Sequence, residues 1–506
     1  MVTPSQATIL LELAQSALVF QDVDGDTCYG TIEVDDRHET WALRSRGFKH
    51  WLAMQFFVSE GKVPGRQGLH DAIAMLEARA RYQGIIEPVY VRVAPGPGGT
   101  IIVDLADEDW QAVHITPDGW KMTSSSPAKF RRARGMQALP RPTRGGALIK
   151  LKDFVNVQDD DDWMLVVGWL LATFRPKGPY PVLVLSGEQG SAKTVLSKLL
   201  KALIDPNTAP VRSLSREERE LMIAANNGYL LAFDNLSGLP NWLSDALCRL
   251  AAGGSFAVRR LYTDDEEVLF QAARPVLLNG IEEMISRPDL GDRAIFLSLT
   301  PIADSQRRPE GELWRQFELV RPHILGALLD AVAQGLRALG QVRLEALPRM
   351  ADFALWATAC EMALWPAGIF ARAYAANRRT AIESIMEADP IATCLRSIMA
   401  DRTTWTGSAS DLLRLCAESA RESPPGGIAW AKNLQTLAGR LRRAQTFLRT
   451  VGIEITFSRE GRTGTRIIRS TAAEETVTTV SSVSIVSAAR SHGCPADQAA
   501  FAGMRE

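Results

Sequence analysis

The chain has 506 residues, of which 46% are hydrophobic and 23% charged, and its net charge is −1. This composition is typical of a soluble globular protein of about three domains, and a nearly neutral chain can bind nucleic acid only through local basic patches. Its six cysteines form no CxxC pair and no zinc spacing, which indicates thiols in a reducing cytoplasm. We find no signal peptide and no run of the ~20 apolar residues that a membrane helix needs, so we expect a cytoplasmic protein without a membrane partner.

The first 120 residues alternate between short segments typical of strands and amphipathic segments typical of helices. This predicts an α+β accessory domain over residues 1–120. The run DVDGD at 22–26 suggests either a metal site or a solvated turn. Because it lacks a third ligand at a useful spacing, the turn is favoured. No primase signature with catalytic acids is found here.

Residues 121–152 form a basic connector with nine lysines and arginines and no acidic residue. Prolines and a pair of glycines break its regular structure. A basic segment of this kind can follow a phosphate backbone. It can equally be a solvated linker that packs on a neighbouring domain, and the sequence leaves both interpretations open.

A glycine-rich loop, GEQGSAKT at Gly187–Thr194, lies between an apolar run typical of a buried strand and a segment typical of a helix. In this order, backbone N–H groups and the helix N-terminus point at phosphate oxygens. We therefore expect Lys193 to reach the β- and γ-phosphates of ATP and the Thr194 hydroxyl to hold Mg²⁺. Ala192 replaces the glycine of the usual GxxxxGK[ST] pattern. The residues expected to bind ATP are Gly187, Glu188, Gln189, Gly190, Ser191, Ala192, Lys193 and Thr194.

In the segment GYLLAFDNLS, a second apolar run is followed directly by Asp234. An acid at this place is expected to be the carboxylate that helps to hold Mg²⁺. A glutamate that polarises the attacking water often follows such an acid, but here Asn235 follows. Asparagine can orient a water molecule but cannot accept its proton. Either hydrolysis is slow or another acid serves, with Asp245 as a weak candidate.

Two further residues complete the expected catalytic set of Lys193, Asp234, Asn235, Asn279 and Arg293. Asn279 ends the run RPVLLNGI, where its side chain can touch the γ-phosphate and the attacking water, or simply form a turn before Gly280. Arg293 follows Asp292 just before an apolar strand. It can face the γ-phosphate of a neighbouring subunit, or it can make an ordinary salt bridge with Asp292 or another neighbour.

With these elements in order, the segment from about 155 to 300 resembles the core of superfamily 3 helicases, in the poxvirus-type primase–helicase lineage common in phages and plasmids. The order is GEQGSAKT, FDN, CRLAAGGSFAVRRLYTDDEEVLF, PVLLNGI and DR. It also resembles uncharacterised ATP-binding proteins encoded in mobile elements. The helicase resemblance implies an AAA+-like core, a ring that is usually a hexamer, and directional movement on single-stranded DNA.

The resemblance further implies a β-hairpin between the second and third motifs that points into a central pore. Gly253 and Gly254 would begin it, and the expected DNA contacts are Arg259, Arg260 and Tyr262. Arginine suits phosphate contact and tyrosine suits base stacking. The alternative is a structural hairpin with solvated charges.

The predicted fold is thus an α/β P-loop NTPase core of the superfamily 3 type over 153–305, with a helical extension over 306–385. Residues 386–470 contain helices followed by two strands around a glycine turn, which suggests a winged-helix-like domain. Its basic residues are Arg440, Arg442, Arg443, Arg449, Arg459, Arg462, Arg466 and Arg469. Such a domain contacts double-stranded DNA or another protein. The tail over 471–506 has the composition of a disordered segment.

The leading hypothesis is an ATPase that acts as a DNA helicase or replication initiator of a mobile element, with ATP and Mg²⁺ as cofactors. The main alternative is a nucleotide-gated assembly or sensor ATPase, for example in phage–host conflict, because slow hydrolysis beside Asn235 suits a switch. A small-molecule kinase is a weaker third hypothesis, since it leaves the basic hairpin and the C-terminal domain without a role.

Overall fold

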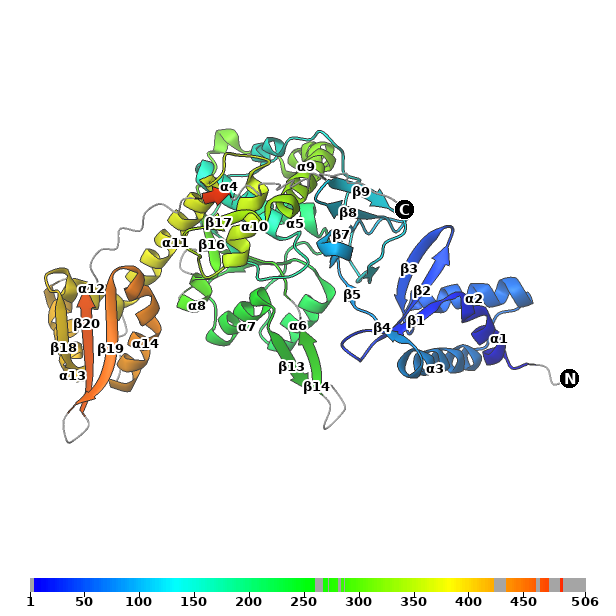
Figure 1. The fold of residues 1–506 in the computed structure, drawn as a ribbon, viewed down its shortest axis with the longest axis horizontal. Helices are drawn as coiled ribbons and strands as arrows, with labels where there is room; N and C mark the ends of the chain where they lie inside the picture. The colour runs from blue at the N-terminus through cyan, green and yellow to red at the C-terminus, as the bar shows by residue number, and fades with distance from the viewer. Residues whose placement is uncertain are drawn as a thin grey trace, which may run out of the picture.

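The computed structural model describes residues 4–259, 267–271, 273–280, 284–285, 287–422, 434–460, 465–472 and 483–485. Its described parts form an N-terminal unit, a central body and a C-terminal unit that lie in a row (Figure 1). Within the described residues, no helix is both long and apolar enough to span a membrane.

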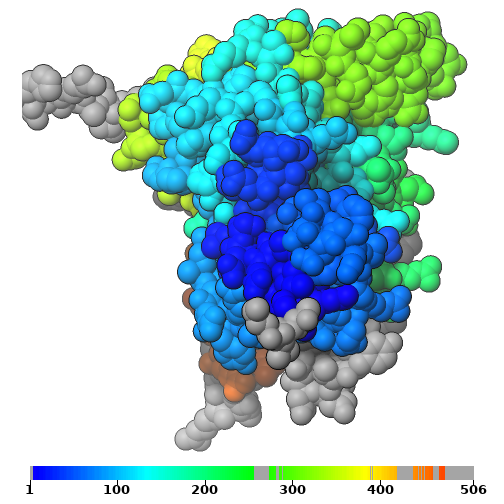
Figure 2. All heavy atoms as spheres, turned by 90° about the vertical axis from the view of Figure 1, so that its right-hand side faces the viewer, coloured from blue at the N-terminus to red at the C-terminus, as the bar shows by residue number. Residues whose placement is uncertain are grey.

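The N-terminal unit is a four-stranded sheet with the order β3-β2-β1-β4, in which β4 is parallel to β1. Its elements are α1 (Gln6–Leu13), η1 (Ala14–Ser16), β1 (Leu18–Gln21), β2 (Cys28–Val34), β3 (Arg37–Ala42), α2 (Arg46–Glu60), α3 (Arg66–Tyr82) and β4 (Ile85–Ile86). The three α-helices pack on a core of their own. Viewed from the N-terminal side, this unit is a blue lobe below the cyan residues near 120–150 (Figure 2). In the DVDGD run, the Asp22 carboxylate accepts the N–H groups of Val23 and Val89, so this stretch is a hydrogen-bonded turn.

A second, antiparallel sheet has the order β6-β7-β8-β9 and packs against the central body. The segment 1–120, expected as one domain, therefore contains two sheets, and the second one extends to Thr123. The elements of this region are β5 (Val89–Tyr90), β6 (Val93–Pro95), η2 (Pro97–Gly99), β7 (Ile101–Asp104), β8 (Ala112–Thr116), β9 (Gly119–Thr123), β10 (Lys129–Phe130) and η3 (Leu148–Phe154).

The basic side chains of the connector are largely engaged with neighbouring parts of the chain. Arg132 forms an ion pair of 2.8 Å with Asp104 and lies over the ring of Trp110. Arg141 pairs with Asp109. The guanidinium of Arg144 lies 4.4 Å from the centre of the Trp120 ring. These contacts favour the interpretation of a linker packed on its neighbours over that of a DNA track.

The central body is built on four parallel strands with the order β12-β15-β11-β16. Its elements are α4 (Asp160–Ala172), β11 (Val182–Gly187), α5 (Lys193–Ile204), α6 (Glu218–Asn227), β12 (Leu231–Leu236), α7 (Asn241–Ala252), β13 (Ser255–Arg259), β14 (Glu267–Gln271), β15 (Val276–Gly280), α8 (Pro288–Gly291) and β16 (Ala294–Leu299). Leu183 and Leu185 of β11 pack in one core with α4 and α5, and Val182 and Val184 pack in another with α6 and α7. A parallel sheet covered on both faces explains the continuous apolar run of β11.

The helices that follow the sheet connect the central body to the C-terminal unit. They are α9 (Glu310–Ala338), α10 (Ala351–Glu361) and α11 (Ile369–Ala388), with η4 (Asp304–Gln306) before them and the short strand β17 (Val342–Leu344) between α9 and α10. Helix α11 contacts α4 and β16 at one end and α12 and α14 at the other, and Figure 1 shows it running between the two bodies.

The C-terminal unit comprises α12 (Pro390–Ala400), β18 (Thr404–Ser408), α13 (Ala409–Glu422), α14 (Leu434–Thr450), β19 (Ile453–Glu460) and β20 (Thr465–Ala472). Its strands form an antiparallel sheet with the order β18-β20-β19. A disulfide joins Cys394 of α12 to Cys416 of α13, which differs from the expectation of unpaired thiols. Within the tail expected to be disordered, β21 (Val483–Ile485) pairs with β17.

Candidate functional site

The glycine-rich loop lies at the carboxyl edge of the parallel sheet, between β11 and α5. Its backbone takes left-handed conformations at Gly187 (φ 140°), Gly190 (φ 87°) and Ala192 (φ 62°). A β-carbon on Gly187 would lie 2.3 Å from the carbonyl oxygen of Leu299, so only glycine fits there. At Ala192 the strain of a left-handed alanine is on the order of 1–2 kcal/mol, which explains why glycine is usual at this position.

The ammonium group of Lys193 spans the loop from the first turn of α5. Its Nζ donates to the carbonyl oxygens of Gly187 and Glu188, both at 2.7 Å, and to the hydroxyl of Ser191 at 3.3 Å. Partial burial lowers the pKa of Lys193, and the nearby Asp234 carboxylate opposes that shift. The loop therefore holds a positive charge at its centre.

Thr194 and Asp234 meet across the gap between α5 and β12. The Thr194 hydroxyl donates to Oδ1 of Asp234 at 3.0 Å. One hydroxyl and one carboxylate at this edge are oxygen donors of the kind that Mg²⁺ prefers. The residues present therefore fit a magnesium ion shared with a phosphate.

Asn279 is fully buried and lies inside β15 rather than in a turn. Its Oδ1 accepts the backbone N–H of Asn235 at 3.1 Å, and its Nδ2 donates to the Ser197 hydroxyl at 2.8 Å. Asn235 itself has a left-handed backbone with φ 60°. Asn279 thus links β15, β12 and α5 and holds the irregular part of β12 that follows Asp234. Of the two predicted roles, a turn is not what the structure has, and a contact with the γ-phosphate stays a prediction.

Arg293 lies at the opposite end of the sheet from the glycine-rich loop. In the register of β11 and β16, Val182 stands opposite Ala294 and Gly187 opposite Leu299. Five strand residues separate the two ends by about 17 Å, so Arg293 cannot touch a phosphate in its own subunit's loop. Its guanidinium pairs with Asp289, and the Arg293 side chain is 17% exposed. Within one chain, the ordinary salt bridge is the contact that is present.

The remaining predicted residues divide between described and undescribed parts of the chain. Asp245, the weak candidate for the base, pairs with Arg287 at 2.9 Å. The β13–β14 hairpin projects from the central body (Figure 1), and its register places Arg259 opposite Glu267. Arg260 and Tyr262 lie outside the described residues.

Two residues that the sequence did not single out contact the loop. The Asn156 amide donates to the carbonyl oxygens of Ser191 at 3.1 Å and of Thr300 at 2.7 Å. Arg307 approaches Gly190 from the segment after β16. Both contacts join residues far apart in the chain, so no local pattern predicts them. The helical spacing from Lys193 to Ser197 could have predicted that Ser197 lies near the site.

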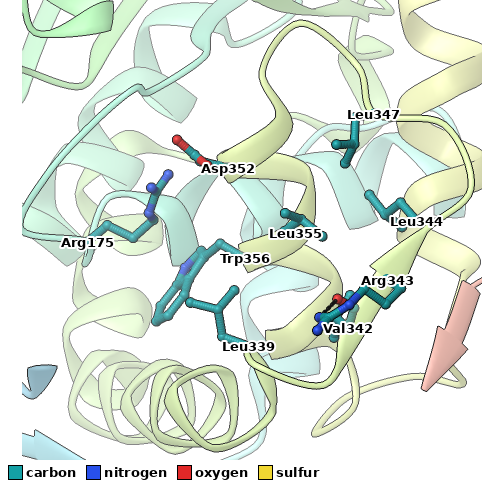
Figure 3. A pocket seen from close by; sticks show the side chains of 9 residues that line it. All are labelled: Arg175, Leu339, Val342, Arg343, Leu344, Leu347, Asp352, Leu355 and Trp356. Carbon is teal, nitrogen blue, oxygen red and sulfur yellow. Dashed lines mark hydrogen bonds between the residues drawn. The ribbon is translucent and has the colours of Figure 1, made fainter. Parts of the chain in front are cut away.

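A cavity of about 440 Å³ is separate from the carboxyl edge of the parallel sheet and lies between the end of α9, β17 and α10 (Figure 3). Leu344 and Leu347 line one side of it, and Arg175, Asp352 and Trp356 line the other. Strand β21 of the tail lies beside it through its pairing with β17. The cavity contains none of the predicted site residues.

The fold and site define an α/β protein with a central parallel sheet and a cationic, glycine-rich loop at its carboxyl edge. Residues 146–378 match the family of the actinomycete integrative conjugative element replication protein, AICE RepA, and residues 391–484 match the AICE RepA C-terminal domain. The two matched segments of this chain are thus similar to those of a replication protein of an integrative conjugative element. No curated protein sequence matches the chain.

Among solved structures, the A form apo structure of the NrS-1 C terminal region is similar over 93% of this chain and 100% of its own, with 13% identity and a TM-score of 0.42. A second apo structure of that region has the same coverage, 12% identity and a TM-score of 0.40. JCV Helicase is similar over 46% of this chain and 70% of its own, with 13% identity and a TM-score of 0.24. At these scores the likeness carries no argument about function.

Proposed function

We propose that this chain is an ATP-dependent DNA motor of the superfamily 3 type, a helicase or replication initiator of its mobile element, and that it acts as a ring on single-stranded DNA. The observation that carries the proposal is the geometry at one edge of the parallel sheet. There the Lys193 ammonium spans the glycine-rich loop, and the Thr194 hydroxyl meets the Asp234 carboxylate at 3.0 Å. A P-loop that binds ATP with Mg²⁺ requires these groups together.

In hydrolysis, a water oxygen bonds to the γ-phosphorus, the bond to the β–γ bridging oxygen breaks, and a proton leaves the water. Lys193 neutralises charge on the β- and γ-phosphates. Thr194 and Asp234 would hold Mg²⁺, which supplies further positive charge to the phosphates. Asn235 is exposed beside Asp234 and can orient the water, but its amide cannot accept the proton. Turnover is therefore expected to be slow unless another carboxylate serves as the base.

We assign Arg293 a role between subunits of the proposed ring. Because it lies about 17 Å along the sheet from its own subunit's loop, it can stabilise the γ-phosphate only of an adjacent subunit. In that ring, which we take to be a hexamer, Arg293 exchanges part of its pairing with Asp289 for contact with the neighbour's nucleotide.

The DNA contacts are proposed on two parts of the chain. Arg259, Arg260 and Tyr262 are the proposed contacts to single-stranded DNA, and of these Arg259 is the last residue of β13 in the projecting hairpin. In the C-terminal unit, helices α12, α13 and α14 with the β18-β20-β19 sheet follow the order of a winged helix. Its exposed arginines, which suit the backbone of double-stranded DNA, are Arg442, Arg449, Arg459, Arg466 and Arg469.

A strand-separation assay tests the motor function. The full chain is mixed with a forked duplex and either ATP or a non-hydrolysable analogue, with Lys193→Ala as the matched variant. We expect separation only with wild-type protein and ATP. ATP hydrolysis that proceeds without any strand separation would contradict the proposed motor function.

Asn235 favours a second candidate, a nucleotide-gated assembly or sensor ATPase. Its left-handed backbone is held by Asn279, and its amide is a poor substitute for a catalytic glutamate. Such a switch would assemble with ATP and turn over far below once per second. Sedimentation with and without ATP, together with the turnover rate, tests the switch. The strand-separation assay then distinguishes the two candidates, because only a motor separates strands processively.

A further inference from the structure

Arg307 lies directly beside the glycine-rich loop, although it comes more than a hundred residues later in the chain. A β-carbon built on Gly190 would stand 3.2 Å from Nη2 of Arg307. Gly190 has a positive φ of 87° and no side chain, so the guanidinium can approach the turn closely. A second cation therefore flanks the loop at whose centre Lys193 lies.

The segment that carries Arg307 is attached to the loop by hydrogen bonds. The backbone N–H of Ile302 donates to the carbonyl oxygen of Gly190 at 3.2 Å. The Asn156 amide bridges the carbonyl oxygens of Ser191 and Thr300. The start of the segment is thus held against two adjacent residues of the loop, Gly190 and Ser191, and this places Arg307 close to any ligand of the loop.

The charge of Arg307 is only weakly neutralised within the chain. Its carboxylate partner is Asp304 at 3.1 Å, and the two side chains are 58% and 90% exposed. Exposed pairs of this kind are typically worth about 0–1 kcal/mol, so an anion with several negative charges competes with Asp304 readily. Guanidinium groups bind phosphate oxygens through paired, charge-assisted hydrogen bonds.

We propose that Arg307 is a phosphate-binding residue of the nucleotide site, supplied by the same subunit that supplies the glycine-rich loop. This inference rests on the proposed function, since it assumes that the loop binds a nucleoside triphosphate. It adds a second cation to the nucleotide site beside Lys193. Arg307 belongs to the same subunit as the loop that it contacts, whereas Arg293 acts on the loop of the next subunit. Loss of Arg307 weakens binding even in an isolated subunit.

Arg308 provides a matched control, because it is also exposed and carries the same charge. Arg307 has an extended backbone, with φ −67° and ψ 135°, so consecutive side chains there point in different directions. Arg308→Ala removes the same charge from the same segment without removing the group beside Gly190.

The experiment titrates the full chain with a fluorescent ATP analogue and with inorganic tripolyphosphate as a competitor, using wild type, Arg307→Ala, Arg307→Lys, Arg308→Ala and Lys193→Ala. We expect Arg307→Ala to weaken both ligands about tenfold, Arg307→Lys to restore part of the loss, and Arg308→Ala to bind within about twofold of wild type. Thermal unfolding should be unchanged by these exposed substitutions.

The outcomes separate this inference from the proposed function. If Lys193→Ala abolishes binding and Arg307→Ala binds like wild type, the role of Arg307 is overturned and the nucleotide site stands. Equal losses in Arg307→Ala and Arg308→Ala would also overturn it, since they indicate a general charge effect. If Arg307→Ala weakens the binding of the ATP analogue but not of tripolyphosphate, Arg307 contacts the base and not the phosphates, and the proposed role is overturned. If wild type and Lys193→Ala both fail to bind nucleotide, the proposed function itself is wrong.

Discussion

The side-chain oxygen of Asn279 accepts the backbone N–H of Asn235 at 3.1 Å, and this bond joins the inner strand β15 to the irregular part of β12 directly after Asp234. The other end of the amide holds Ser197 on α5. The position of the Asp234 carboxylate relative to Thr194 therefore depends on a buried residue that lies between the two elements.

Replacing Asn279 with alanine should lower the free energy of unfolding by about 2 kcal/mol, because it leaves buried polar groups without partners. ATP turnover should fall more than ATP affinity, since the irregular part of β12 beside Asp234 loses its support. Denaturant unfolding and steady-state kinetics measure the two effects. Asn377→Ala is the control: Asn377 bonds the backbone of Phe296 on the edge strand β16, so its loss should reduce stability and leave turnover unchanged. Equal kinetic effects in both variants would contradict the role of Asn279.

Ala192→Gly should stabilise the protein by about 1 kcal/mol, because glycine adopts the left-handed backbone of this position without strain. ATP affinity should be unchanged or slightly higher. Denaturant unfolding tests the sign of the effect. The same substitution at exposed Ala252, the last residue of α7, should instead destabilise by up to about 1 kcal/mol. Destabilisation by Ala192→Gly would show that the strain is not significant.

Arg293→Ala should reduce DNA-stimulated ATP turnover at least about a hundredfold while ATP binding persists. Mixing it with Lys193→Ala subunits should restore activity, because some sites then combine an intact loop with a neighbour's intact arginine. Arg349→Ala is the control, since Arg349 also pairs with Asp289 but is not assigned to the phosphate. If mixing restores nothing, or if Arg349→Ala is equally inactive, Arg293 acts only through its salt bridge.

Asp205→Ala should destabilise the protein by about 3–5 kcal/mol, since it leaves Arg92 and Lys201 buried without their carboxylate. Burial alone would raise the pKa of Asp205, but Lys201 and Arg92 outweigh it, and the pKa is lowered. Its stabilisation is therefore fully present above the unfolded pKa of about 4 and is lost only as the pH falls through the lower folded value.

The destabilisation by Asp205→Ala should accordingly be constant from about pH 5 to pH 8. Urea unfolding at several pH values measures it. The control is Asp109→Ala, which removes the exposed partner of Arg141 and should lower the free energy of unfolding by less than about 1 kcal/mol. If the free energy of unfolding lost in Asp205→Ala varies strongly across this pH range, the ionised state assigned to Asp205 is contradicted.

Local patterns predicted the parts of the site that are contiguous in the chain. The apolar run before Gly187, the loop and the helix from Lys193 are present as β11, the loop and α5. The run that ends near Asp234 is β12, next but one to β11 in the sheet. Each of these depends on residues within one turn or one strand, where periodicity is informative.

The sequence could not predict contacts between distant segments. The bridging role of Asn279 depends on strand order, the approach of Arg307 to Gly190 depends on the path after β16, and the pairing of β21 with β17 joins segments more than a hundred residues apart. The split of residues 1–120 into two sheets was likewise missed, because alternating strands and helices do not reveal which strands pair.

A DNA motor driven from the glycine-rich loop is tested most directly by the ATP turnover of the full chain with and without single-stranded DNA, measured beside Lys193→Ala. We expect single-stranded DNA to stimulate turnover several-fold and Lys193→Ala to abolish turnover in both conditions. Turnover that is indifferent to DNA, or that survives in Lys193→Ala, would contradict a DNA motor driven from the glycine-rich loop.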